Sequence, residues 1–246
     1  AVGRYALLNF TGSDAVAIGS GAADAATSAA RLTAIGKDAL GAAQTQADCT
    51  AVGFGALDAA TGGSNNTAVG SQALSGTIDG VRNTVMGYAA ISNSDCGDDN
   101  TAIGSSALNV FTGTNAVAVG SGAAYSATSA AYTTAVGFNA LGACSEGSSN
   151  TAVGSNTLAL LVGTGSSGGT GGDNNVALGA SAGYSTTGSR NIYLGRSAGL
   201  YATTTDDCIA IGYSALQAAD SAGDNSDNAT GNSNIAIGSY SLDATT

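Results

Sequence analysis

A glycine recurs along this chain at a nearly constant interval, and that interval restricts the folds open to the chain. It closes a short apolar motif, of which Thr67-Ala68-Val69-Gly70 is an example. The repeat glycines are Gly3, Gly19, Gly36, Gly53, Gly70, Gly87, Gly104, Gly120, Gly137, Gly154, Gly179, Gly195, Gly212 and Gly238. Successive members are 16 or 17 residues apart, except for steps of 25 and 26 residues before Gly179 and Gly238. Such a period predicts a single solenoid array over residues 1–246, in which each repeat contacts mainly its neighbours.

The residues before each glycine predict a short strand. With the repeat glycine as position zero, position −1 is apolar, position −2 is nearly always Ala, and position −3 is nearly always Thr, Val or Ile. This alternation with β-branched residues is typical of a strand. An Ala-Leu pair at positions +3 and +4, such as Ala73-Leu74, predicts a second short strand. The glycine between the two strands is expected to form a corner.

Two short strands and a turn cannot enclose a core alone, but stacked coils can. We therefore predict an all-β fold, a parallel β-solenoid (β-roll) of about 14 coils with a 17-residue repeat. At ~4.8 Å per coil the array would be roughly 65 Å long. We expect position −1 and the +4 leucine to point into the core. The alanines at −2 and +3 would then point outward, where they either pack against another surface or merely suit a thin coil.

Asparagine occupies position −4 in half of the repeats. The asparagines at this position are Asn66, Asn83, Asn100, Asn150, Asn175, Asn191 and Asn234. Stacked in register, these side chains predict a hydrogen-bonded ladder along the array.

Two stretches interrupt the period and predict loop insertions near residues 160–174 and 218–233. Loops on a rigid scaffold often carry binding sites, and a tolerated surface insertion is the alternative.

A longer repeat is also present, because residues 10–42 realign with residues 111–143 at an offset of 101 residues. Duplication of such blocks favours a long array over a compact enzyme.

Composition argues against several classes of function. The net charge of −11 argues against nucleic acid as a partner, because phosphate binding needs clustered cations. The chain has no His to serve as a base. The pairs Asp98-Asp99 and Asp206-Asp207 are interpreted as solvated charges, and the Asp-rich stretches lack the spacing of a calcium loop. No apolar run is long enough to span a membrane. We therefore predict no enzyme activity, no catalytic, cofactor-binding or metal-binding residues, and no cofactor.

The four cysteines are Cys49, Cys96, Cys144 and Cys208. In a regular stack, successive cysteines would lie nearly three coils apart, too far for a disulfide within one chain. They are expected either to be buried and inert or to form disulfides between subunits. Cys49 and Cys208 share position −4, which is expected to face outward at a corner.

The segments NTAVGSQAL (66–74), NTAIGSSAL (100–108) and NTAVGSNTL (150–158) resemble the NTAIGxxAL arrays of phage tail-fibre-like and bacterial surface fibre proteins. They are also similar to the head repeats of trimeric autotransporter adhesins, whose period is shorter. The resemblance covers nearly the whole chain. It implies a left-handed roll, often with three chains side by side, in extracellular fibres that attach to surfaces or hosts.

We accordingly expect a structural subunit or segment of an extracellular fibre or filament that serves surface attachment. Its expected partners are further copies of itself, as a trimer or filament, and a host or surface glycan or protein. Because Ala1 lies inside a motif and neither end carries a cap, we expect a segment of a longer array or end-to-end stacking.

The alternative is an ice-binding β-solenoid, since position −3 holds a regular column of threonines. This column comprises Thr33, Thr50, Thr67, Thr84, Thr101, Thr134 and Thr151. Against it, position −3 shares its side of the strand with the apolar position −1, so the column is expected to point inward. A glycan-binding fibre is a third hypothesis, but the chain lacks Trp.

Overall fold

The structure is a computed structural model that describes residues 1–42, 45–59, 62–76, 79–92, 95–144, 147–161, 172–217 and 231–243. The chain forms two compact units, residues 1–121 and residues 122–246, which are considered separately. The described residues form strands, turns and bends, with no helix among them. The all-β prediction is confirmed. The loop insertions predicted near 160–174 and 218–233 lie largely outside the described residues.

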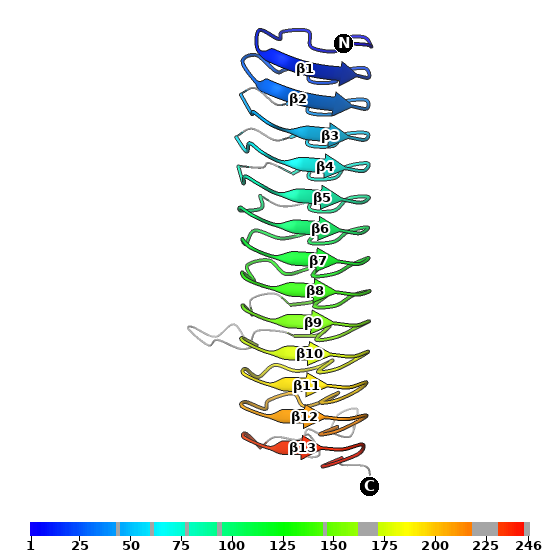
Figure 1. Cartoon of the computed structure of the whole chain (residues 1–246), viewed down its shortest axis with the longest axis vertical. Coiled ribbons are helices and arrows are strands. Elements are labelled where there is room, and N and C mark those ends of the chain that lie inside the picture. The colour runs from blue at the N-terminus through cyan, green and yellow to red at the C-terminus, as the bar shows by residue number, and fades with distance from the viewer. Residues whose placement is uncertain are drawn as a thin grey trace. The chain divides into compact units, whose positions relative to one another are not determined.

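The described residues of the first unit form seven short strands that pair in sequence order, every pair parallel. They are β1 (Ser13–Ile18), β2 (Ala30–Ile35), β3 (Thr50–Val52), β4 (Thr67–Val69), β5 (Thr84–Met86), β6 (Thr101–Ile103) and β7 (Val117–Val119). A bridge between Val2 and Ile18 adds one more rung before β1. Figure 1 shows β1 to β7 as successive rungs whose arrows point the same way.

The second unit repeats this arrangement, with six strands in the part of it that the structure describes. They are β8 (Thr134–Val136), β9 (Thr151–Val153), β10 (Val176–Leu178), β11 (Ile192–Leu194), β12 (Ile209–Ile211) and β13 (Ile235–Ile237). Each unit is thus a parallel β-solenoid with a repeat of about 17 residues, as predicted. The single array predicted over residues 1–246 stays a prediction, as does its handedness.

The core of each coil contains the alanines that were expected outside. Ala68 at −2, Ala73 at +3 and Leu74 at +4 are all fully buried, whereas Val69 at −1 is only half-buried. The inward position of the leucine is confirmed, but the orientation predicted for −1, −2 and +3 is wrong. In a three-residue strand the middle side chain points opposite to its two neighbours, so burying −2 exposes −3 and −1. A 17-residue coil is narrow, and small alanines beside one leucine fill it.

The Ala-Leu segment forms turns, and the second strand predicted there is wrong. The Ala73 N–H donates to the Gly70 carbonyl at 3.3 Å, closing a four-residue turn. Gln72, the third residue of that turn, has a φ of 57°, the sign that a type II turn requires. Leu74 also has a positive φ, and its N–H donates to Ala90 in the next coil at 2.9 Å. Turns in adjacent coils are therefore bonded to each other, as the strands are.

The repeat glycines occupy a corner where the backbone of a following coil leaves no room for a side chain, as at Gly53 and Gly70, whereas a Cβ on Gly238 would meet open space. All fourteen have φ between 116° and 141°. A Cβ on Gly70 would lie 2.5 Å from the Gly87 carbonyl oxygen in the next coil. The corner therefore needs glycine both for its backbone conformation and for the close approach of neighbouring coils.

The asparagine ladder predicted at position −4 is present. The Asn66 Oδ1 atom accepts the Asn83 N–H at 2.8 Å, and the Asn83 Oδ1 atom accepts the Asn100 N–H at 2.9 Å. In the second unit, Asn150, Asn175 and Asn191 continue the same pattern at 2.9 to 3.0 Å. These asparagines are fully buried, so the ladder satisfies backbone groups that would otherwise lack partners.

Candidate functional site

The outward side of the strands is the most distinctive surface of each unit. We call it the strand face, and it consists of the side chains at positions −3 and −1 of every strand. These side chains are Thr, Val, Ile, Leu or Met throughout β1 to β13, without a single charge. Many are well exposed, for example Ile18 at 44%, Met86 at 48% and Leu178 at 45%. Contiguous exposed apolar side chains generally mark an interaction surface.

In the first unit, five consecutive strands present threonine at position −3. We call this part of the strand face the threonine face; it comprises Thr33, Thr50, Thr67, Thr84 and Thr101 with Ile35, Val52, Val69, Met86 and Ile103. Each threonine pairs directly with the next, from Thr33 opposite Thr50 to Thr84 opposite Thr101. The column is therefore straight and in register across β2 to β6.

In the second unit, four consecutive strands present only aliphatic side chains. We call this part the aliphatic face; it comprises Val176, Leu178, Ile192, Leu194, Ile209, Ile211, Ile235 and Ile237. All eight are at least partly exposed. A soluble monomer seldom presents such an ordered set of bare aliphatic side chains, so this face is a candidate contact surface.

Ion pairs join neighbouring coils beside the strand face, at position −5. Arg31 forms a bidentate pair with Asp48, Arg82 with Asp99, and Arg190 with Asp207. Hydrogen bonds from the arginines hold the pKa values of Asp48, Asp99 and Asp207 below their usual value. Sequence reasoning missed these pairs, although a signal was present. Each Arg precedes its Asp by 17 residues, the length of one coil.

The adjacent carboxylates of Asp98-Asp99 and Asp206-Asp207 share one arginine, but the first of each pair also bonds a backbone N–H. Asp98 accepts the Val81 N–H of the preceding coil at 2.9 Å, while Asp99 pairs with Arg82. Likewise Asp206 accepts the Ser189 N–H at 2.7 Å, while Asp207 pairs with Arg190. Both pairs thus hold the register between coils, and their interpretation as simple solvated charges is incomplete.

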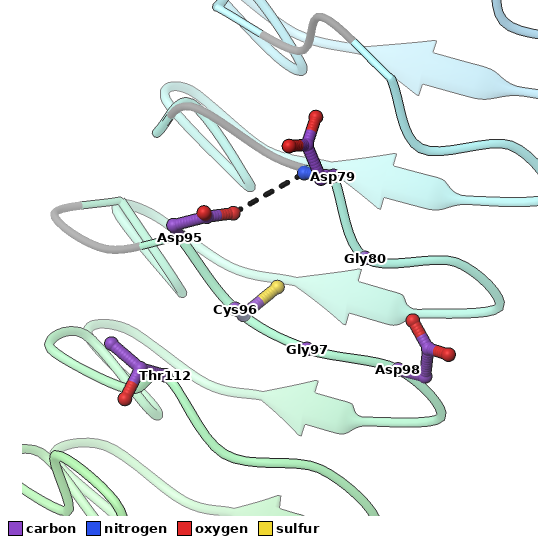
Figure 2. Close-up of a pocket in the computed structure, with 7 residues that line it drawn as sticks. All are labelled: Asp79, Gly80, Asp95, Cys96, Gly97, Asp98 and Thr112. Atoms are coloured by element: carbon purple, nitrogen blue, oxygen red, sulfur yellow. Dashed lines mark hydrogen bonds between the residues drawn. The ribbon is translucent and has the colours of Figure 1, made fainter.

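An open hollow of about 330 Å³ lies in the first unit, lined by Asp79, Gly80, Asp95, Cys96, Gly97, Asp98 and Thr112. Figure 2 shows Asp95 turned toward the Asp79 backbone, whose N–H it accepts at 3.2 Å, with Asp98 at the other end of the segment. The acidic side chains are thus spread along the hollow. Among the described residues, no group of three or more Cys, Asp or Glu side chains is suited to hold a metal ion.

All four cysteines are unpaired and buried in their coils. The Cys49 thiol donates toward the Gly63 carbonyl at 3.5 Å, and the Cys208 thiol accepts the Asn234 N–H at 3.3 Å, so both stand in the asparagine column. Burial raises the pKa of Cys96 to about 12 and that of Cys144 to about 11. The outward orientation predicted for Cys49 and Cys208 is wrong, because position −4 points into the coil. A disulfide to another subunit would require a coil to open.

Lys37 and Glu146 are the only lysine and the only glutamate in the sequence. Lys37 pairs with its neighbour Asp38 at 2.6 Å on the surface, and Glu146 lies outside the described residues. The described part of the chain includes no helix that is long and apolar enough to cross a membrane.

No protein-family model, curated protein or solved structure matches this chain.

Proposed function

We propose that this protein is a structural subunit of an extracellular fibre and that copies associate side by side through the aliphatic face. The observation that supports this most is the exposure of eight aliphatic side chains on β10 to β13, including Ile235 at 64% and Ile237 at 67%. Covering them removes apolar surface from water, which stabilises an association by ~25 cal/mol per Å² before the costs of association.

The absence of charge on the aliphatic face makes it the surface through which a second copy can bind. Each chain carries a net charge of −11, so two copies repel each other over most of their surfaces. The strand face has no charged side chain and is therefore where two copies approach most easily. Two such faces also carry the same ~4.8 Å spacing along the coils, which allows their side chains to interdigitate.

The size of the face sets the expected strength of association. Four coils at ~4.8 Å and three-residue strands at ~3.3 Å per residue give a face of roughly 20 by 10 Å, or about 200 Å² in outline. This is well below the ~800 Å² per partner of a standard stable interface. We therefore expect weak, concentration-dependent association of isolated molecules, as suits a fibre whose strength accumulates over many repeated contacts. Attachment to a host or surface glycan or protein, and location outside the cell, are parts of the same proposal that follow from the resemblance alone.

Sedimentation velocity over a range of concentrations tests the proposal, with two variants of one coil compared. Leu178→Asp places a charge in the aliphatic face, while Ala180→Asp places the same charge on an exposed site just beyond the corner Gly179. We expect the unmodified protein and Ala180→Asp to associate as concentration rises, and Leu178→Asp to remain monomeric. A purely monomeric unmodified protein, or equal association of both variants, would show that the aliphatic face is not the contact.

A further inference from the structure

The threonine face carries hydroxyl groups that form no hydrogen bond with other residues that the structure describes. Thr33, Thr50, Thr67, Thr84 and Thr101 make no side-chain hydrogen bond within the described part of the chain. Several threonines elsewhere behave differently. The Thr157 hydroxyl, for example, donates to the Gly179 carbonyl at 2.6 Å. The five hydroxyls on β2 to β6 are therefore available to bond water.

These hydroxyls form a regular and rigid array. Parallel strands place successive threonines ~4.8 Å apart, and the aliphatic residue two positions along lies ~6.6 Å away. Threonine is β-branched and has few χ1 rotamers, so its hydroxyl and methyl directions are restricted. Backbone bonds between coils fix each strand, as when the Gly70 N–H donates to Val52 at 2.8 Å. The strands that carry these hydroxyls are therefore held rigidly.

We propose that the threonine face binds ice. Ice presents rows of water oxygens that repeat on the same scale as this array, so hydroxyls at a fixed spacing can take lattice positions. The methyl groups of Thr and the side chains of Ile35, Val52 and Val69 order the water between those positions. No charge on the face holds a disordered hydration shell. This inference does not depend on the proposed association, which uses the aliphatic face of the other unit.

The orientation of the strands removes the objection that the sequence raised. Position −3 does share its side of the strand with position −1, as expected, but that side is outside. In β10 to β13 the threonines are replaced by Val or Ile, and in β7 by Val117. The inference is therefore confined to β2 to β6, where five threonines follow one another without interruption.

The test measures thermal hysteresis and inhibition of ice recrystallisation with the full chain and three variants. Thr67→Lys and Thr84→Lys place a long charged side chain in the middle of the array. Gln72→Lys places the same side chain on an exposed turn position of the coil that contains Thr67. Circular dichroism spectra and thermal unfolding of each variant check that the coils remain folded.

We expect the unmodified chain and Gln72→Lys to show thermal hysteresis and to shape ice crystals, and both threonine variants to lose most of that activity. Leu178→Asp should retain it, which separates this inference from the proposed association. Absence of hysteresis and recrystallisation inhibition in the unmodified chain would overturn the inference. So would full activity in folded Thr67→Lys and Thr84→Lys.

Discussion

The ring of Tyr193 occupies space that Gly199 leaves open. Tyr193 stands at position −2, where nearly every other coil has alanine, and it is fully buried. A Cβ on Gly199 would lie 2.2 Å from the Tyr193 ring, and one on Gly183 in the preceding coil would lie 2.6 Å from it. Both glycines stand at position +4, where most coils carry leucine. The extra volume of the Tyr193 side chain is therefore offset by the two glycines, which lack the leucine side chains of other coils, so the width of the core stays the same.

Coupled substitutions should reveal this compensation. Gly199→Leu alone forces a leucine into the ring and should destabilise the second unit by ~1–3 kcal/mol, the usual cost of overpacking. Tyr193→Ala alone leaves a cavity and should cost ~3–5 kcal/mol. The double variant restores the Ala and Leu found in other coils, so its loss of stability should be smaller than the sum. Urea unfolding of all four proteins measures the coupling, and strict additivity would show that the residues do not share this space.

Two glycines of one coil should differ in how well they tolerate alanine. Gly53 is a corner glycine, and its Cβ would lie 2.4 Å from the Gly70 carbonyl oxygen. Gly55 stands two residues later at a φ of 58°, with its nearest Cβ contact at 3.9 Å, and other coils place Gln72 or Ser106 there. Gly55→Ala should cost ~1 kcal/mol through its left-handed backbone, and Gly53→Ala considerably more. Thermal unfolding of both variants tests this, and equal melting temperatures would contradict it.

The sequence predicts the repeat, the strand before each corner glycine, the parallel register of these strands and the asparagine ladder, because each depends on spacing alone. It does not predict which side of the strand is inside. Alternation defines two sets of residues, and the bulkier set, such as Thr67 and Val69, resembles a core. The interior of the coil is instead set by Leu74 and by turns at Gln72 and Leu74 whose positive φ no side chain signals. That error also concealed the candidate site, since the exposed strand face had been assigned to the core.

Removal of one ion pair should destabilise the fold less as the solution becomes acidic. Hydrogen bonds from Arg82 lower the folded-state pKa of Asp99, so the pair stabilises the fold fully above the unfolded pKa of ~3.9. This contribution is lost as the pH falls through the lower folded pKa. Arg82→Gln should therefore lower the melting temperature slightly near neutral pH, and the difference should shrink in strong acid.

Arg196→Gln provides the control for that experiment. Arg196 forms no ion pair within the described part of the chain and lies over the Tyr213 ring. Arg196→Gln should therefore cause no melting-temperature difference that shrinks as the pH falls below the pKa of the carboxyl groups. A destabilisation by Arg82→Gln that stays constant, or grows, as the pH falls would show that the ion pair is not its cause.

The four thiols should react slowly while the coils are folded. Each is at most 1% exposed, and burial raises the pKa values of Cys49, Cys96 and Cys144, which keeps these thiols in the unreactive protonated form. A thiol reagent should label all four rapidly in denaturant and slowly without it, and non-reducing gels of oxidised native protein should show only monomer. Cys49→Asn with Cys208→Asn should fold, since the same column holds Asn66 and Asn191, and should leave two reactive thiols in denaturant. Rapid labelling or disulfide-linked dimers of the folded chain would mean that a coil opens readily enough to expose position −4.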